Sequence, residues 1–172
     1  MLQVALVGDS HLTDSSSRPV TKLGPRLRSA GFDVVNLARG GLDTRQALLD
    51  SPPSDVDWIV YCFGTNDAAP WKRVPACEYE RNYETLLASG AGTSQLVLGP
   101  PPVVDHPGGR NNGLVRQYSD IAARAARGHG ADFVALIDHL SQSDLADDGV
   151  HLNDFGYQAV TGLVTAALRP AK

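Results

Sequence analysis

The sequence predicts an α/β fold in which a five-stranded parallel sheet carries helices on both faces. Three observations support it: short apolar runs alternate with longer amphipathic segments, two of the runs are apolar nearly throughout, and no repeat, linker or charge block interrupts the pattern. Strands that alternate with helices are typical of parallel sheets. The chain is long enough to bury one core, so residues 1–172 are expected to form a single domain.

The expected strands are the short apolar runs. In chain order they cover residues 2–8, 32–37, 57–63, 95–99 and 133–137. The third and the fifth have almost no polar positions, which favours strands that are covered on both faces of the sheet.

Five helices are expected between and after these runs. In three of them the apolar side chains recur clearly at helical spacing, and these helices cover residues 79–90, 112–128 and about 155–168. Residues 18–30 and 44–50 give weaker patterns, the first because Gly24 and Pro25 interrupt it.

Composition and charge restrict the possible functions. The net charge of −4 and the pI near 5.6 argue against a nucleic-acid or anionic-membrane surface, which needs clustered Lys and Arg. No apolar stretch approaches the ~20 residues of a membrane-spanning helix, and the N-terminus lacks a signal-peptide pattern. We therefore expect a soluble, cytoplasmic protein, with export open if a leader has been removed. The two cysteines, Cys62 and Cys77, show no metal-binding spacing, and nothing requires a disulfide between them.

The loops that follow the strands carry the residue types that acyl transfer requires. Ligands of parallel α/β sheets bind at the carboxyl ends of the strands, where these loops meet. Ser10 can act as a nucleophile if a base lies within hydrogen-bond reach. His151 can be that base, and Asp148, three residues earlier, can orient its ring. The backbone N–H groups of Ser10 and Gly41 and the side-chain amide of Asn66 can donate to a developing oxyanion.

These candidates have alternative interpretations. The serine and the asparagine are also ordinary turn residues, and the histidine could be a solvent-exposed residue before the last helix. Asp147 competes with Asp148 as the partner of the base, although the three-residue spacing favours Asp148. Asp9 and Asp67 are interpreted as structural acids that accept local backbone N–H bonds in turns.

Four blocks of the sequence resemble those of the GDSL/SGNH hydrolase family. The blocks are Gly8-Asp9-Ser10, Gly41, Gly64-Thr65-Asn66-Asp67 and Asp148-Gly149-Val150-His151. Their order and spacing match the family, and they span nearly the whole chain. The resemblance implies a flavodoxin-like three-layer sandwich and a serine esterase or lipase-type activity without metal or organic cofactor. By motif position it assigns Ser10 as nucleophile, His151 as base and Asp148 as its partner. It places Gly41 and Asn66, with the backbone of Ser10, in the oxyanion hole.

Two positions depart from the pattern of the family. His11 stands where a small or apolar residue is more usual after the serine, and it either lines the pocket or packs beside the nucleophile. Gly40 precedes Gly41, which leaves open which glycine donates to the oxyanion. His11, Gly40 and Trp71 are the candidates for substrate binding.

The expected function is hydrolysis of carboxylic esters with short acyl groups, for example acetyl esters of a sugar or a small alcohol. Small insertions leave no obvious deep tunnel for a long acyl chain. Transfer of the acyl group to another alcohol would use the same site. A non-catalytic flavodoxin-like binding module is the alternative from another class, but the sequence contains neither a G-x-G-x-x-G nor a P-loop pattern. The oligomeric state stays open.

Overall fold

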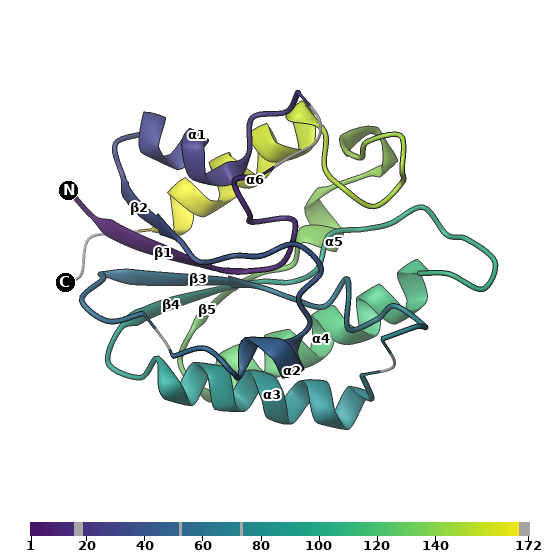
Figure 1. Ribbon diagram of the computed structural model, residues 1–172, viewed down its shortest axis with the longest axis horizontal. Coiled ribbons are helices and arrows are strands. Elements are labelled where there is room, and N and C mark those ends of the chain that lie inside the picture. The colour runs from purple at the N-terminus through teal and green to yellow at the C-terminus, as the bar shows by residue number, and fades with distance from the viewer. Residues whose placement is uncertain (16–18, 52, 73, 169–172) are drawn as a thin grey trace.

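The protein is built on a five-stranded parallel sheet with the strand order β2-β1-β3-β4-β5 (Figure 1). The computed structural model describes residues 1–15, 19–51, 53–72 and 74–168. The strands are β1 (Gln3–Gly8), β2 (Asp33–Asn36), β3 (Trp58–Cys62), β4 (Ser94–Leu98) and β5 (Asp132–Val134). The expected number and parallel direction of the strands are confirmed.

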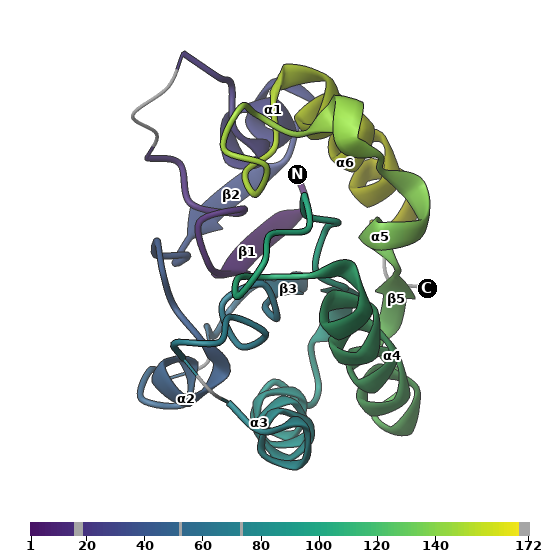
Figure 2. The same cartoon turned by 90° about the vertical axis from the view of Figure 1, so that its right-hand side faces the viewer.

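Helices cover both faces of the sheet and form a three-layer sandwich. They are α1 (Leu23–Ser29), α2 (Thr44–Ala47), α3 (Ala76–Ser89), α4 (Asn112–Gly128), α5 (Leu136–His139), the 3-10 helix η1 (Gln142–Asp144) and α6 (Asp154–Ala167). Helices α1 and α6 lie on one face, and α2, α3 and α4 lie on the other (Figures 1 and 2). The flavodoxin-like architecture that the resemblance implies is therefore confirmed.

Strand β3 lies in the middle of the sheet and contributes to two cores. Its residues are all buried, and successive side chains point to opposite faces. Trp58, Val60 and Cys62 belong to the core under α1 and α6, whereas Ile59 and Tyr61 belong to the core under α3 and α4. The apolar run of this strand is the signature of burial on both faces.

The fifth strand differs from its expectation. It ends at Val134, and Leu136 starts the short helix α5, which the sequence analysis did not predict. The strand lies at the edge of the sheet, and its three residues are exposed or only partly buried, although Phe133 and Val134 still pack against the cores on opposite faces. A short apolar run fits a strand and a buried helical turn equally well, so its periodicity does not separate the two.

Two helix boundaries also differ from the expectation. Helix α1 begins only at Leu23, and Pro25 falls in its first turn, where the missing N–H has no helical partner in any case. Residue 18 of the expected helix 18–30 lies outside the described residues. Helix α2 is limited to Thr44–Ala47, where Asp43 and Gln46 form a capping box.

The carboxyl ends of the central strands bring the functional loops together, and these ends face the viewer in Figure 2. Gly8 at the end of β1 pairs with Cys62 at the end of β3, and the N–H of Asp9 donates to the Cys62 carbonyl at 3.2 Å. The loops that carry Ser10 and Asn66 therefore start side by side.

Two further findings concern membrane-spanning helices and the cysteines. In the described parts of the chain, no helix combines the length and apolar character needed to cross a membrane. Cys62 is buried, Cys77 is exposed, and both are free thiols.

Candidate active site

Ser10, His151 and Asp148 form a continuous hydrogen-bonded chain at this edge of the sheet. His151 Nε2 lies 3.0 Å from Ser10 Oγ, and His151 Nδ1 lies 2.6 Å from Asp148 Oδ2. The other oxygen of Asp148 accepts the backbone N–H groups of Val150 at 3.0 Å and His151 at 2.9 Å. The carboxylate is thus oriented by its own loop. The geometry pairs the His151 ring with Asp148, as the three-residue spacing favours, and not with Asp147.

The loop that presents His151 is folded tightly by local backbone bonds. The N–H of Ala146 donates to the His151 carbonyl at 2.7 Å, and the N–H of Gly149 donates to the Ala146 carbonyl at 2.9 Å. Gly149 has φ +68°, and a Cβ there would lie 2.8 Å from Val104. Both the backbone conformation and the close packing therefore require glycine. Asn153 then caps α6 by accepting the N–H of Gly156, so the loop ends in a fixed helix start.

The two backbone donors expected for an oxyanion are accessible. Among the described residues, the N–H groups of Ser10 and Gly41 have no acceptor, and both residues line a cavity of about 440 Å³ that also contains His151. Gly41 has φ +77°, a conformation that favours glycine. Gly40 lines the same cavity, so the structure leaves both glycines at the site.

The side chain of Asn66 bonds to segments far away in the sequence. Its Nδ2 donates to the Leu42 carbonyl at 2.9 Å and contacts Asp9 Oδ2 at 3.4 Å. Its Oδ1 accepts a hydrogen bond from Arg110 Nη2 at 3.1 Å. The alternative interpretation, an amide that bonds its own turn, does not describe these contacts. The contact with Asp9 is long for a hydrogen bond, so one N–H of the amide is only weakly engaged.

Arg110 is a site residue that the sequence analysis did not single out. Its Nε donates to the Thr65 carbonyl at 2.9 Å, and its guanidinium lies 4.6 Å from the centre of the Trp71 ring. Burial lowers the pKa of Arg110, and the nearby charges of Asp9 and Asp148 oppose this shift. The sequence offers one signal for Arg110. It lies in a long connection rich in Pro and Gly, and long loops in compact domains are usually functional.

Trp71 borders the catalytic pocket through a neighbouring cavity. This cavity has a volume of about 430 Å³ and shares Arg110, Asp148 and Val150 with the catalytic pocket. The Trp71 side chain is 62% exposed although it stacks on Arg110. An exposed aromatic ring at a pocket rim offers an apolar face to a ligand.

His11 does not line the catalytic pocket, so its assignment to substrate binding is wrong. The side chain is 2% exposed, its Nδ1 lies 2.9 Å from Asp9 Oδ1, and its Nε2 lies 3.1 Å from the Val150 carbonyl. His11 is held next to the His151 ring, at 5.8 Å between ring centres, and contacts the carbonyl of Val150, the residue that precedes His151. This corresponds to the other interpretation, a histidine that packs beside the nucleophile.

The two additional acids play different structural roles. Asp9 accepts the backbone N–H of His11 at 2.9 Å, which is the local turn bond expected for it. Asp67 instead accepts the backbone N–H of Thr44 at 2.9 Å and its hydroxyl at 2.6 Å, so the local interpretation is wrong for this residue. Burial raises the pKa of Asp67 to about 6, against the hydrogen bonds from Thr44. Among the described residues, Asp67 Oδ2 has no hydrogen-bond partner.

Comparisons with known proteins agree with this architecture. The sequence pattern of the GDSL-like Lipase/Acylhydrolase family matches residues 6–159. No curated protein sequence matches the chain. A lipase/acylhydrolase from Enterococcus faecalis superposes with a TM-score of 0.78 at 19% identity, with all of both chains covered.

Two further solved structures share the fold. A catalytic mutant of an acetylxylan esterase from Geobacillus stearothermophilus has a TM-score of 0.76 at 17% identity, covering 99% of this chain and 97% of that one. A carbohydrate acetylesterase from Sinorhizobium meliloti has a TM-score of 0.73 at 17% identity, covering 98% and 100%. At these identities the structures show the fold alone, and the family match carries the assignment. The chain belongs to the GDSL-like lipase/acylhydrolase family and is a carboxylic ester hydrolase.

Proposed function

We propose that the protein hydrolyses esters of short acyl groups, acetyl esters of a sugar foremost, through an acyl-enzyme on Ser10. One observation carries the proposal: the unbroken chain from Ser10 Oγ through the His151 ring to the Asp148 carboxylate, with links of 3.0 and 2.6 Å. A serine hydroxyl is a weak nucleophile unless a base removes its proton as it attacks. His151 is placed to act as that base.

The reaction proceeds in two halves. Ser10 Oγ attacks the ester carbonyl carbon while His151 Nε2 takes the hydroxyl proton, and Asp148 stabilises the imidazolium that forms. The tetrahedral intermediate collapses, the leaving alcohol receives the proton from Nε2, and the acyl group stays on Ser10. Water then attacks the acyl-enzyme, with His151 again taking a proton, and the carboxylate product leaves as Ser10 recovers its hydrogen.

Three donors are assigned to the oxyanion. The N–H groups of Ser10 and Gly41 are unused by any described residue, and the weakly engaged N–H of the Asn66 amide completes the set. Donors held in place before the reaction stabilise the developing charge without reorganisation. Arg110 contributes indirectly, because its bond to Asn66 Oδ1 orients the amide nitrogen.

The lining of the pocket favours a small acyl group on a polar alcohol. The catalytic cavity is bordered by polar side chains, glycines and one valine, and it adjoins the cavity that Trp71 lines. A polar pocket without an apolar tunnel gives little binding energy to a long alkyl chain. Two structures with the same fold are, by their descriptions, an acetylxylan esterase and a carbohydrate acetylesterase, which favours the same substrate class.

A panel of substrates tests this proposal. We expect kcat/KM to be highest for p-nitrophenyl acetate and to fall for the butyrate and octanoate esters, with acetylated xylooligosaccharides as substrates. Ser10→Ala should abolish hydrolysis with an almost unchanged Tm, and a serine-directed phosphonate should label Ser10 in the wild type. Trp71→Ala should raise KM for the acetylated sugars and leave that for p-nitrophenyl acetate unchanged. Wild-type activity in Ser10→Ala would refute the nucleophile, and a preference for octanoate would refute the acyl class.

A further inference from the structure

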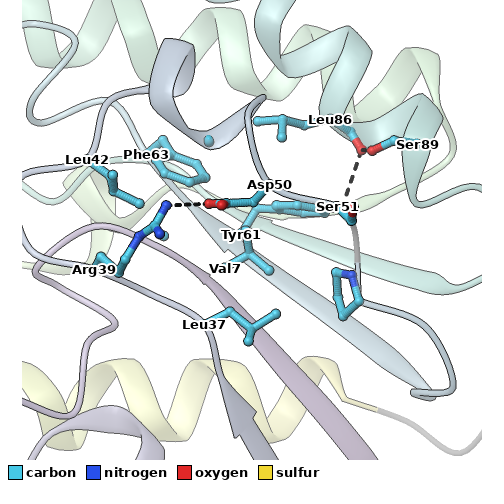
Figure 3. Close-up of a pocket in the computed structure, with 13 residues that line it drawn as sticks. Val7, Leu37, Arg39, Leu42, Asp50, Ser51, Tyr61, Phe63, Leu86 and Ser89 are labelled. Atoms are coloured by element: carbon cyan, nitrogen blue, oxygen red, sulfur yellow. Dashed lines mark hydrogen bonds and ion pairs between the residues drawn. The ribbon is translucent and has the colours of Figure 1, made fainter.

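Apart from the cavity at Trp71, the catalytic pocket has another neighbour, a cavity on the face of the sheet that α2 and α3 cover (Figure 3). We call it the second cavity. It encloses about 300 Å³, and no residue that lines it also lines the catalytic pocket. Its walls are mostly apolar and come from β1, the segment that follows β2, β3 with the residue after it, the end of α2 with the segment that follows it, and the C-terminal half of α3. The main apolar contributors are Val7, Leu37, Leu42, Tyr61, Phe63 and Leu86.

A short segment of chain separates the two cavities. Arg39 and Leu42 border the second cavity, whereas Gly40 and Gly41 between them border the catalytic pocket. The carbonyl of Leu42 also holds the amide of Asn66. The second cavity is therefore adjacent to the proposed catalytic machinery but distinct from it.

Arg39 and Asp50 form an ion pair at the mouth of the cavity, and a ligand carboxylate can take the place of Asp50. Arg39 Nη2 bonds Asp50 Oδ2, and the two side chains point toward each other across the opening in Figure 3. Their side chains are 57% and 52% exposed, so the pair adds little to stability. A carboxylate ligand can replace Asp50 at Arg39 at little cost. Leu37, 44% exposed, forms an apolar part of the same rim.

The size and lining of the cavity define its ligand. A volume of about 300 Å³ lies at the small end of ligand cavities. Since a water-sized group takes up ~30 Å³, about ten non-hydrogen atoms fill the space. We propose that this cavity binds a medium-chain alkyl carboxylate such as octanoate, with its chain against Tyr61, Phe63 and Leu86 and its carboxylate on Arg39. Carboxylates are also the products of the proposed reaction, but the binding itself does not depend on that reaction.

Calorimetric titration of octanoate into Ser10→Ala protein tests the proposal, because this variant binds without turnover whatever the mechanism of hydrolysis is. We expect binding of one octanoate per chain. Arg39→Gln should weaken it, and Asp50→Asn, which frees Arg39, should tighten it, each by about three- to fivefold. Binding of 1-octanol should respond to neither change. Effects of the same sign in the two variants, or an equal response of the alcohol, would overturn the assignment of the carboxylate to Arg39.

A matched pair of substitutions tests the location. Leu37→Trp places a large ring over the cavity mouth and should abolish octanoate binding. Leu49→Trp makes the same change at a leucine that is 85% exposed and does not line the cavity, so it should leave binding unchanged. Octanoate that binds Leu37→Trp normally would lie in the catalytic pocket, and this would refute the proposal. If the protein elutes as a dimer and binds no octanoate, the face around the second cavity would be an interface with a second copy of the chain. This outcome would also refute the proposal.

Discussion

The loop that carries His151 and the loop that carries Asn66 border the same pocket but are held in different ways. The first is folded by its own backbone and by Asp148, which accepts two N–H groups within three residues. The second is held by side-chain bonds to distant segments, from Asn66 to Leu42 and from Thr44 to Asp67. One loop is a local structure, and the other depends on the packing of the whole domain.

This difference separates chemistry from stability. A substitution of Asp148 or His151 in the first loop should remove a group that the proposed reaction needs but few contacts that hold the fold together. In the second loop, the side chain of Asn66, the proposed oxyanion donor, also connects the end of β3 to Leu42, so its substitution should change both activity and stability. Measuring kcat and the free energy of unfolding for the same variants tests this difference between the two loops.

The largest effect is expected at Asp148. Asp148→Asn should lower kcat by ~10⁴, because the amide no longer holds the His151 tautomer that accepts the proton of Ser10. The Tm should stay close to that of the wild type, since the amide oxygen can still accept the N–H groups of Val150 and His151. Steady-state hydrolysis of p-nitrophenyl acetate and thermal unfolding measure the two quantities.

Asp147→Asn is the matched control for this prediction. Asp147 is exposed and adjacent in sequence, so its substitution should leave kcat and Tm at wild-type values. Equal losses of kcat at both positions would contradict the choice of Asp148. A large fall in the Tm of Asp148→Asn would contradict the local character of the loop.

Asn66→Ala should reduce both activity and stability. Loss of one oxyanion donor lowers kcat by about 10²–10³ with little change in KM. In addition, the Leu42 carbonyl and the Arg110 guanidinium each lose a partner, which should lower the free energy of unfolding by about 1–3 kcal/mol. Urea unfolding monitored alongside kcat checks both. A lowered stability with normal kcat would reduce Asn66 to a structural residue.

Asp67 should make stability depend on pH. Its pKa is raised from 3.8 to about 6 in the folded protein. Between these values the folded state keeps a proton that the unfolded chain has lost, so the contribution of Asp67 to the free energy of unfolding falls as pH rises from about 4 to 6. Replacement by Asn removes this titration. The difference in unfolding free energy between pH 4 and pH 7 should therefore shift by about 1–3 kcal/mol in Asp67→Asn relative to the wild type. An identical pH dependence in the two proteins would argue against the burial of a carboxylate here.

The smallest effect is expected at Arg110, which acts through Asn66. Arg110→Gln should lower kcat by about five- to tenfold at a nearly constant KM, because the amide of Asn66 loses the bond that orients it. Arg110→Lys should recover little of the lost kcat, since an ammonium does not reproduce both the bonds to Thr65 and Asn66 and the stacking on Trp71. Arg116→Gln on α4 removes an equally charged but remote side chain and should have no effect. A change confined to KM would assign Arg110 to substrate contact instead.

Much of the site was accessible from the sequence because its main elements are local. The strand ends at Gly8 and Cys62 follow from apolar runs, and the spacing of Asp148 and His151 places both in one turn. The fold-class prediction is confirmed for the same reason, because alternating runs and helices leave few ways to arrange a parallel sheet. Short segments were harder, since the apolar residues from Phe133 to Ile137 divide between a strand and a helix that the pattern does not distinguish.

The sequence by itself determined the fold class and the candidate residues for the proposed ester hydrolysis, because strand patterns and motif spacing are properties of neighbouring residues. Only the tertiary structure decided that His11 is buried against Asp9 and Val150, that Arg110 reaches Asn66, and that Asp67 bonds Thr44. It alone also revealed the second cavity behind Arg39. Apart from the bond between His11 and Asp9, these contacts join segments that lie tens of residues apart, and their partners are set by how the helices pack on the sheet.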